Sequence, residues 1–212
     1  MKKISKIAVI GGTGKAGSYL VKELIKQAYN LKLLLRNPEN FQFPNSTVEL
    51  IKGDARDYAS VSRLINGADA VISTLGQPKG ESPIFSSASK NVIQAMGESG
   101  IRRYILISGL NVDCPTDKKG PKTRFATDWM KTNYPETTND RQLEFDLLSK
   151  SGLEWTLVRL PMIELTEERK RMEVNLEDCI GENISAADLA CFLISQLTDD
   201  SYFQQAPFIA NR

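Results

Sequence analysis

The feature that most constrains this chain is a glycine-rich turn placed directly after a short apolar run near the amino terminus. Residues 7–10 are apolar and rich in β-branched side chains, which is typical of a strand buried on both faces. Glycines follow at positions 11, 14 and 17, and residues 18–28 then carry leucine, valine and isoleucine at helical spacing. The order of strand, tight turn and helix predicts the first part of a βαβ unit.

The same alternation of short apolar runs with amphipathic segments continues along the chain. We expect further strands at residues 31–35, 47–51, 68–73, 104–107, 155–158 and near 208–209. We expect helices at residues 58–65, 84–98 and 186–197, the last capped by Ser185, and one that carries the stripe Leu143, Leu147 and Leu148. This pattern specifies an α/β fold, a doubly wound parallel sheet (Rossmann fold), in a single domain over residues 1–212.

Two segments, residues 110–124 and 163–183, interrupt this rhythm, and we expect them to form small substrate-side insertions. The first is polar and contains two prolines, and the second is dense in charge, with a mixed-sign run at residues 167–171 that is typical of a solvated helix face. Both follow predicted strands at the carboxyl edge of the sheet, where open α/β sheets bind their ligands. Long irregular segments are often lids or substrate loops, and disorder is the alternative.

Composition argues against several classes of function. The formal net charge of +1 disfavours a nucleic-acid partner, which needs a concentrated positive field. The absence of histidine disfavours a zinc site and a serine–histidine hydrolase, and we predict no metal. Three widely spaced cysteines fit reduced thiols in a cytoplasm, and no apolar stretch reaches the ~18–20 residues of a membrane span. We expect a cytoplasmic protein without a membrane partner, as a monomer or weak homodimer.

The glycine-rich turn predicts a binding site for the pyrophosphate of a dinucleotide. Gly11 permits the tight turn, Gly14 lets the backbone approach the phosphates, and Gly17 lets the helix pack closely against the sheet. An ordinary tight turn is the alternative, and the position between a strand and a helix favours the dinucleotide.

Other groups of the turn can contribute to the same site. The exposed amides at the helix start, including that of Ala16, attract an anion together with the helix dipole. Thr13 could add a hydroxyl and Lys15 a positive charge, or either side chain could be solvated.

The end of the second predicted strand indicates which dinucleotide is bound. An acidic residue ~20 positions after the glycines would bind the ribose hydroxyls of NAD, whereas this chain has Arg36 there, 19 residues beyond Gly17. A guanidinium can bind a 2′-phosphate, so we expect NADP, with NADPH preferred over NADH. Asp54 and Ala55 follow the third strand, where Asp54 could accept a hydrogen bond from the adenine amine or could equally be a turn aspartate.

Seven segments together resemble the atypical short-chain dehydrogenase/reductase group, in its NmrA-like and flavin reductase (biliverdin reductase B-like) branch. They cover nearly the whole chain and read GGTGKAG, LLLRNPE, GDARD, VISTLG, YILISG, SGLEWTLVRLP and ISAADLA. The resemblance implies a Rossmann fold, an NADP(H) coenzyme and a small-molecule acceptor.

The resemblance also assigns residues at the strand ends. Thr74, Leu75 and Gly76 would border the coenzyme, and Ser108 would close the fifth strand near the nicotinamide. The floor beside the nicotinamide amide would be formed by Leu160, Pro161 and Met162.

One departure bears on the chemistry. Standard short-chain dehydrogenases protonate a carbonyl through a Tyr-x-x-x-Lys pair, and here Tyr134 is followed four residues later by Thr138. We therefore expect hydride transfer from NADPH to a conjugated acceptor such as a flavin or quinone-like compound, with Ser108 as the first candidate for a catalytic polar contact and Tyr134 as the second. Trp129 could stack on a ligand, whereas Trp155 is more typical of a core.

Two alternatives to this reductase remain open. The first is a non-catalytic NADP(H)-binding redox sensor of NmrA type, which the missing tyrosine–lysine pair suits equally well. The second is an isomerase or dehydratase with tightly held coenzyme.

Overall fold

The computed structural model describes residues 4–41, 46–78 and 80–212. The strands are β1 (Lys6–Ile10), β2 (Asn30–Leu35), β3 (Val48–Lys52), β4 (Ala70–Ser73), β5 (Arg103–Gly109), β6 (Glu154–Leu160), β7 (Met162–Glu164), β8 (Met172–Asn175), β9 (Asn183–Ser185) and β10 (Phe208–Asn211). The helices are α1 (Lys15–Lys26), α2 (Tyr58–Ile65), α3 (Phe85–Ser99), α4 (Pro121–Asn133), α5 (Pro135–Ser149) and α6 (Ala186–Ser195), with a short 3-10 turn at Pro38–Asn40.

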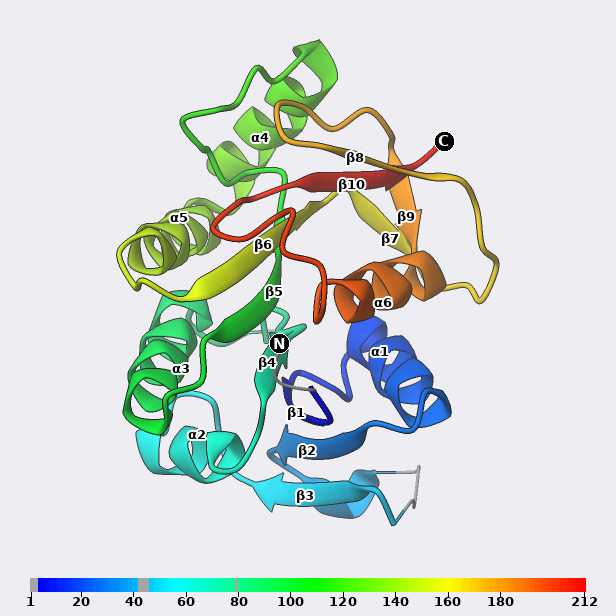
Figure 1. The fold of residues 1–212 in the computed structure, drawn as a ribbon. Helices are drawn as coiled ribbons and strands as arrows, with labels where there is room; N and C mark the ends of the chain where they lie inside the picture. Colours follow the sequence, from blue (N-terminus) through cyan, green and yellow to red (C-terminus); the bar gives the residue numbers. More distant parts are fainter. Residues whose placement is uncertain (1–3, 42–45, 79) are drawn as a thin grey trace.

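A mostly parallel sheet with the strand order β3-β2-β1-β4-β5-β6-β10-β8 runs through the molecule (Figure 1). Strand β8 pairs antiparallel with β10, while the other neighbouring strands run parallel. A separate pair, β7 with β9, lies beside it. The predicted Rossmann-type α/β fold is confirmed.

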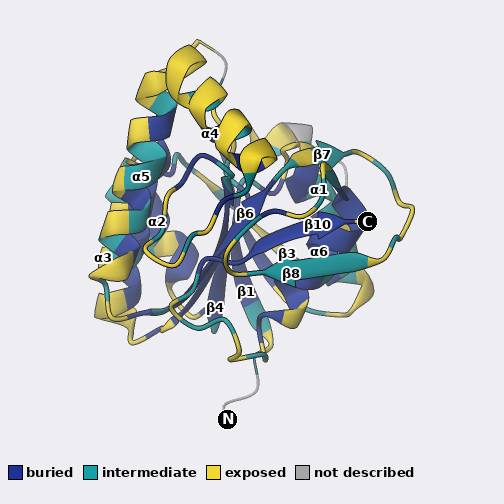
Figure 2. Cartoon of the chain, turned by 90° about the horizontal axis from the view of Figure 1, so that it is seen from above, coloured by how far each residue is buried: buried dark blue, intermediate teal, exposed yellow. Residues whose placement is uncertain are grey.

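Helices cover both faces of the sheet, with α1 and α6 on one face and α2, α3 and α5 on the other (Figures 1 and 2). The buried strands contribute side chains to the cores on both faces of the sheet because successive side chains alternate in direction. In β1, Ala8 and Ile10 join the core with α2, α3 and α5, while Ile7 and Val9 join the core with α1 and α6. This two-sided burial explains why the strand is an uninterrupted apolar run.

The segment at residues 110–124 is more ordered than its composition predicts. Helix α4 begins inside it, with Gly120 as N-cap and Pro121 in the first turn, a position that proline favours. Periodicity missed this helix because its buried positions are Thr123 and Thr127, whereas Phe125 is 74% exposed. The predicted disorder alternative is therefore wrong for the second half of the segment.

Two buried cations hold the first half of that segment in place. The Lys119 ammonium donates to the carbonyl oxygens of Leu110 at 2.8 Å and Val112 at 3.0 Å, and to Asp113 Oδ1 at 2.6 Å. The fully buried Arg159 donates to Asp117 Oδ2 at 2.8 Å and also reaches the Val112 carbonyl. A buried charge needs such partners, so the loop supplies the oxygens that these cations require.

The segment at residues 163–183 also contains strands, since all of β8 and parts of β7 and β9 lie in it. The mixed-sign run at residues 167–171 is not helical, which corrects the prediction of a helix face. Its charged side chains pair with other elements: Lys22 with Glu167 at 2.7 Å, and Lys170 with Glu164 at 2.8 Å.

The helix expected around Leu143 starts at Pro135, and its inward face differs from the prediction. Leu148 is buried, but Leu143 is 50% exposed and Glu144 is buried instead. The Ser185 cap is confirmed, because its Oγ accepts from the Asp188 amide at 3.0 Å. No helix within the described ranges is long and apolar enough to cross a bilayer.

Candidate functional site

The glycine-rich turn joins β1 to α1 and presents the helix start at the carboxyl edge of the sheet. Gly11 has φ +77°, a conformation that L side chains rarely adopt. The Gly14 amide donates to the Gly11 carbonyl at 3.0 Å, and Gly14 is the N-cap of α1. A Cβ on Gly17 would lie 2.0 Å from the Gly11 oxygen, so a glycine there lets the helix approach the turn. Thr13 and Lys15 are exposed, and Ala16 is buried.

The end of β4 closes the turn from the other side. Thr74 is buried, and its Oγ1 donates to the Gly11 carbonyl at 3.2 Å. Leu75 is half-buried and Gly76 is exposed beside it. These contacts fix the turn against two strands, which is the preorganised cradle of backbone amides that a diphosphate requires.

A cluster of four charged side chains lies beyond the ends of β2 and β3. Arg36 Nη1 is 2.8 Å from Glu81 Oε1, and Arg56 Nη2 is 2.8 Å from Glu81 Oε2. Arg56 also pairs with Asp54, with Nη2 2.9 Å from Oδ2. The neighbouring Ala55 is buried, and its carbonyl accepts from the Asn91 amide. The arginine predicted for the 2′-phosphate is thus present at this edge, but it faces a carboxylate.

The electrostatics of this cluster follow from the two guanidiniums. The hydrogen bonds from Arg36 and then Arg56 hold the pKa of the Glu81 carboxyl below its usual range. The hydrogen bond from Arg56 does the same to the pKa of Asp54. Both carboxylates therefore stay ionised at neutral pH, and the cluster carries two charges of each sign.

Ser108 lies next to the end of β5, and its hydroxyl is buried without a hydrogen-bond partner among the described residues. A buried polar atom without a partner is costly and often marks a place where a ligand or water binds. Ser108 is the penultimate residue of β5, at the carboxyl edge of the sheet, and its contact with a nicotinamide stays a prediction.

Arg141 on α5 ties the ends of two strands together beside Ser108. Its guanidinium donates to the Ile107 carbonyl at 2.8 Å and the Leu75 carbonyl at 3.2 Å, and it lies 3.3 Å from the ring centroid of Phe85. It also pairs with the buried Glu144 at 2.9 Å. The sequence analysis missed this residue, because Leu75, Phe85 and Ile107, which it contacts, are distant from it in sequence.

Behind Arg141 lies a buried polar network. Glu144 Oε1 accepts from Ser89 Oγ at 2.7 Å, and Ser89 Oγ is 3.1 Å from the Tyr104 hydroxyl. Burial raises the pKa of both the Glu144 carboxyl and the Tyr104 phenol. Tyr104 is buried and does not reach the carboxyl edge of the sheet, so this network packs beneath Arg141 and forms no part of a ligand-binding surface.

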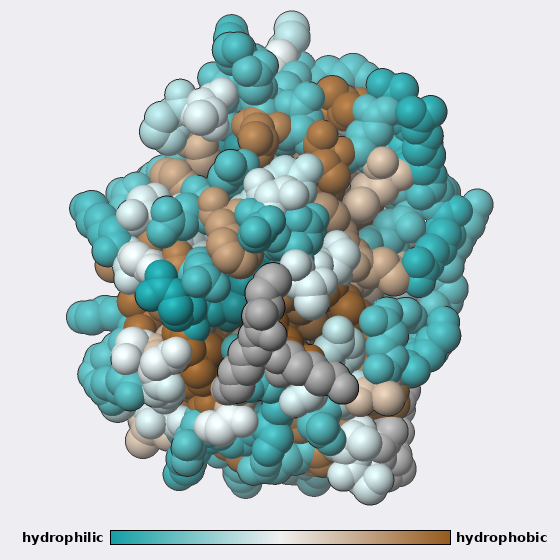
Figure 3. Space-filling view, in the orientation of Figure 1, coloured by the Kyte–Doolittle hydropathy of each residue, from teal (hydrophilic) through white to brown (hydrophobic). Residues whose placement is uncertain are grey.

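An apolar groove of about 860 Å³ lies beyond the end of β5, with Gly109 and Leu110 in its lining. It lies between α4 and the segments that follow β6 and β8, where Figure 3 shows hydrophobic surface near the upper end of the molecule. Side chains that dominate its walls come from both sides and include Phe125, Trp129, Met130, Leu160, Pro161, Met162 and Ile180. The charged Lys122 and Glu182 at the groove pair with each other at 2.7 Å.

The structure brings only part of the predicted substrate-side residues together, because neither Ser108 nor Tyr134 is among the residues that line the groove. Leu160, Pro161 and Met162 line the groove, and Met162 is 77% exposed. Tyr134 is outside the groove lining: it is 52% exposed at the junction of α4 and α5, with its ring centroid 5.6 Å from that of Trp129. Trp155 is buried in the core, as predicted.

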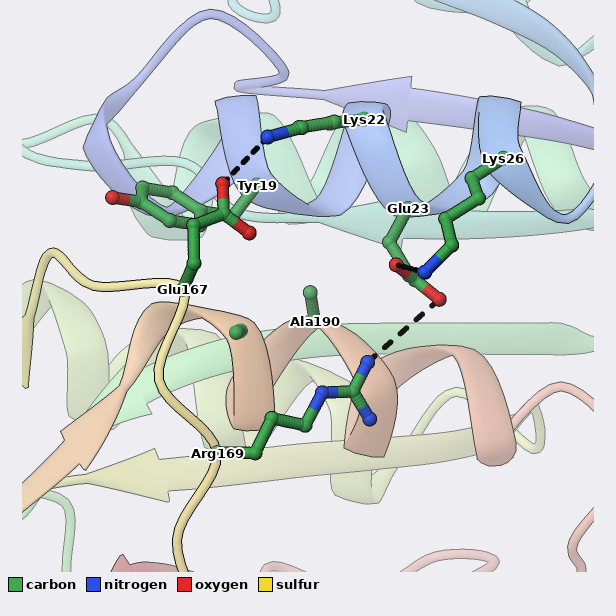
Figure 4. A pocket seen from close by; sticks show the side chains of 8 residues that line it. Tyr19, Lys22, Glu23, Lys26, Glu167, Arg169 and Ala190 are labelled. Carbon is green, nitrogen blue, oxygen red and sulfur yellow. Dashed lines mark hydrogen bonds and ion pairs between the residues drawn. The ribbon is translucent and has the colours of Figure 1, made fainter.

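A second groove lies between α1 and α6 and is lined by charged side chains (Figure 4). Lys22 pairs with Glu167 across it, and Glu23 lies 3.8 Å from Arg169. These pairs attach the segment before β8 to α1, so the groove is best explained as a structural contact.

Comparison with known proteins agrees with this geometry. The family model described as NAD(P)H-binding matches residues 11–200. The chain belongs to this NAD(P)H-binding family. The cradle at the turn fits the diphosphate of such a coenzyme, and the unpartnered Ser108 hydroxyl lies at the same edge of the sheet.

Relatives of this NAD(P)H-binding protein include plant reductases. The chain is 28% identical over 148 residues to cinnamoyl-CoA reductase 1 of Petunia hybrida, which covers 63% of this chain and 44% of that protein. It is 32% identical over 137 residues to eugenol synthase 1 of the same plant, covering 59% and 42%. The chain thus spans less than half the length of these enzymes. A protein of unassigned function from Bacillus subtilis, YwnB, is 22% identical over 72% of this chain and 70% of its own length.

Solved structures share the fold of this NAD(P)H-binding protein. A short-chain dehydrogenase/reductase from Veillonella parvula in complex with NADP has a TM-score of 0.81 at 17% identity, covering 99% of this chain and 95% of that one. A protein from Streptococcus pneumoniae described as an NADH-flavin reductase has a TM-score of 0.77 at 20% identity, covering 98% and 100%. At these identities the likeness shows the fold alone.

Proposed function

We propose that this NAD(P)H-binding protein is an NADPH-dependent reductase that passes a hydride to a planar, conjugated acceptor such as a flavin or a quinone-like compound. The observation that carries the proposal is the apolar groove, which meets the coenzyme edge of the sheet at Gly109 and Leu160. Its volume of about 860 Å³ lies in the range of pockets that bury small ligands, and Phe125 and Trp129 offer ring faces for stacking.

The coenzyme would supply the hydride, and the residues of this chain would position both reactants. The amides of the glycine turn would hold the diphosphate, and Ser108 Oγ would bind the nicotinamide or the acceptor. Arg141 would keep the ends of β4 and β5 at a fixed spacing beneath them. The walls of the groove would exclude water and hold the acceptor against the nicotinamide, so the contribution of the protein is mainly orientation.

The titratable side chains of the groove favour a conjugated acceptor over a ketone. Those in its lining are Lys122, Cys179 and Glu182, of which Lys122 and Glu182 are paired with each other. Burial raises the pKa of the Cys179 thiol, which makes it a poor acid. A conjugated acceptor can take its proton from solvent and needs no such group. The free thiols of Cys114, Cys179 and Cys191 also suit a reducing compartment such as the cytoplasm.

The test is the oxidation of NADPH in the presence of free flavin or a simple quinone. We expect turnover above the rate in buffer, and we expect W129A and F125A to raise KM for the acceptor while KM for NADPH stays unchanged. L143A is the matched control, because Leu143 is 50% exposed on α5 outside the groove. Tight NADPH binding without turnover of any acceptor would refute the reductase and favour the non-catalytic redox sensor.

A further inference from the structure

The loop between β4 and α3 brings an acidic side chain to the edge where the sequence predicted positive charge for a 2′-phosphate. Glu81 bridges two arginines that follow different strands: Arg36 after β2 and Arg56 after β3, each at 2.8 Å. The single carboxylate of Glu81 is therefore paired with both guanidiniums. These are the groups at this edge best suited to an oxyanion, because a guanidinium binds phosphate and carboxylate in the same way.

The backbone of the loop holds Glu81 in this place. The Gln77 side-chain amide donates to the carbonyl of Glu81 at 2.8 Å and to that of Pro78 at 3.1 Å. The Glu81 amide in turn donates to the Pro78 carbonyl at 3.4 Å. These hydrogen bonds fix the backbone at Glu81.

We propose that Glu81 sets the coenzyme selectivity of this site by competing with a ribose 2′-phosphate for Arg36 and Arg56. The inference rests on the proposed coenzyme site at the glycine turn. A 2′-phosphate that approaches the two arginines meets the like-charged Glu81 carboxylate, and it can take the nitrogen donors that Glu81 holds, Arg36 Nη1 and Arg56 Nη2, only when Glu81 moves away. NADH has a free 2′-hydroxyl, which can donate to the Glu81 carboxylate. The ratio of the affinity for NADPH to that for NADH is therefore smaller than it would be if Arg36 faced the 2′-phosphate without Glu81.

The balance of charge sets the size of this effect. Arg36 and Arg56 are neutralised by Asp54 and Glu81, so the cluster offers no net positive charge to a phosphate until Glu81 leaves. The side chains of Arg36 and Glu81 are 55% and 34% exposed, and exposed ion pairs of this kind are weak. Displacement of Glu81 by a phosphate is therefore possible at a modest cost, equivalent to about a fivefold change in affinity.

Calorimetry with adenosine fragments tests the proposal without any need for turnover. The probes are 2′,5′-ADP, which carries the 2′-phosphate, and 5′-AMP, which lacks it, followed by NADPH and NADH. We expect E81Q to bind 2′,5′-ADP about fivefold more tightly, with no gain for 5′-AMP. We expect R56Q to bind 2′,5′-ADP about fivefold more weakly, with little change for 5′-AMP.

The matched control is E154Q. Glu154 pairs with Arg102 at 2.9 Å and is 35% exposed, close to the 34% of Glu81, but it begins β6 at the opposite edge of the sheet. E154Q should change the affinity for neither 2′,5′-ADP nor 5′-AMP. If both fragments bind and E81Q leaves their ratio unchanged, the competition is refuted while the coenzyme site stands. If neither fragment nor coenzyme binds the unmodified protein, the proposed function fails and this inference fails with it.

Discussion

Replacement of Gly17 by alanine tests whether the close approach of α1 to the turn builds the phosphate site. The new Cβ would lie 2.0 Å from the Gly11 carbonyl oxygen and 2.7 Å from Thr74 Oγ1. Because the nearest atom belongs to the backbone, a rotamer change cannot relieve the contact, and the helix and turn must separate. Overpacking of this kind costs about 1–3 kcal/mol, while alanine gains about 1 kcal/mol of helix propensity over glycine. The net loss is about 1 kcal/mol, or about 2–4 °C in Tm for a chain of this size.

Gly97 provides the matched control. It also lies within a helix, α3, but it is exposed and its Cβ would meet nothing within 4 Å. G97A should therefore raise Tm by about 2–4 °C, the opposite sign for the same chemical change.

The binding of NADPH gives the second readout. The Gly14 amide is hydrogen-bonded to the Gly11 carbonyl that the new Cβ would displace, so G17A should misplace the amides that we propose to hold the diphosphate. The loss of one charge-assisted hydrogen bond predicts an affinity about ten- to a hundredfold lower, measured by calorimetry. G97A should bind as the unmodified protein does. If G17A gains as much stability as G97A and keeps its affinity, the steric reasoning is refuted.

Three further predictions concern buried groups. R141M should lower the free energy of unfolding, measured by urea denaturation, by about 3 kcal/mol because it leaves Glu144 buried without its cation. R141M/E144Q should recover part of this loss. Equal losses in both variants would show that the ion pair between Arg141 and Glu144 does not stabilise the fold. K119M should lower the free energy of unfolding by about 2 kcal/mol and raise KM for the acceptor, because Lys119 connects the loop at residues 110–113 to Thr127 of α4. K118M is the control: Lys118 is exposed, so its replacement should change neither quantity. Burial raises the pKa of the Cys114 thiol to about 11, so its alkylation by iodoacetamide, followed by mass spectrometry, should keep rising up to about pH 10, whereas an ordinary thiol levels off near pH ~9. A plateau near pH ~9 would show that the folded protein leaves this thiol unperturbed.

The sequence by itself determined the architecture, and it predicted where in that architecture a coenzyme would bind. The strands buried on both faces must be apolar throughout, and a glycine-rich turn between a strand and a helix has few structural solutions, so both signals are local. The same holds for the carboxyl edge: Arg36, Thr74, Ser108 and Leu160 lie at or just beyond the ends of strands, and parallel strands bring these positions to one edge.

Only the tertiary structure decided what surrounds those positions. Helix α4 has threonines at its buried positions because they face Lys119 and the carbonyls of Leu110 and Cys179. The helix therefore has no apolar stripe from which the groove could be predicted. Arg141 donates to the carbonyls of Leu75, just after β4, and of Ile107 in β5, and Glu81 pairs with Arg36 from 45 residues away in sequence. Hydrogen bonds and ion pairs between distant segments leave no periodic trace in a sequence. The sequence therefore predicted Arg36 as a partner for a 2′-phosphate, and the fold placed the Glu81 carboxylate between Arg36 and Arg56.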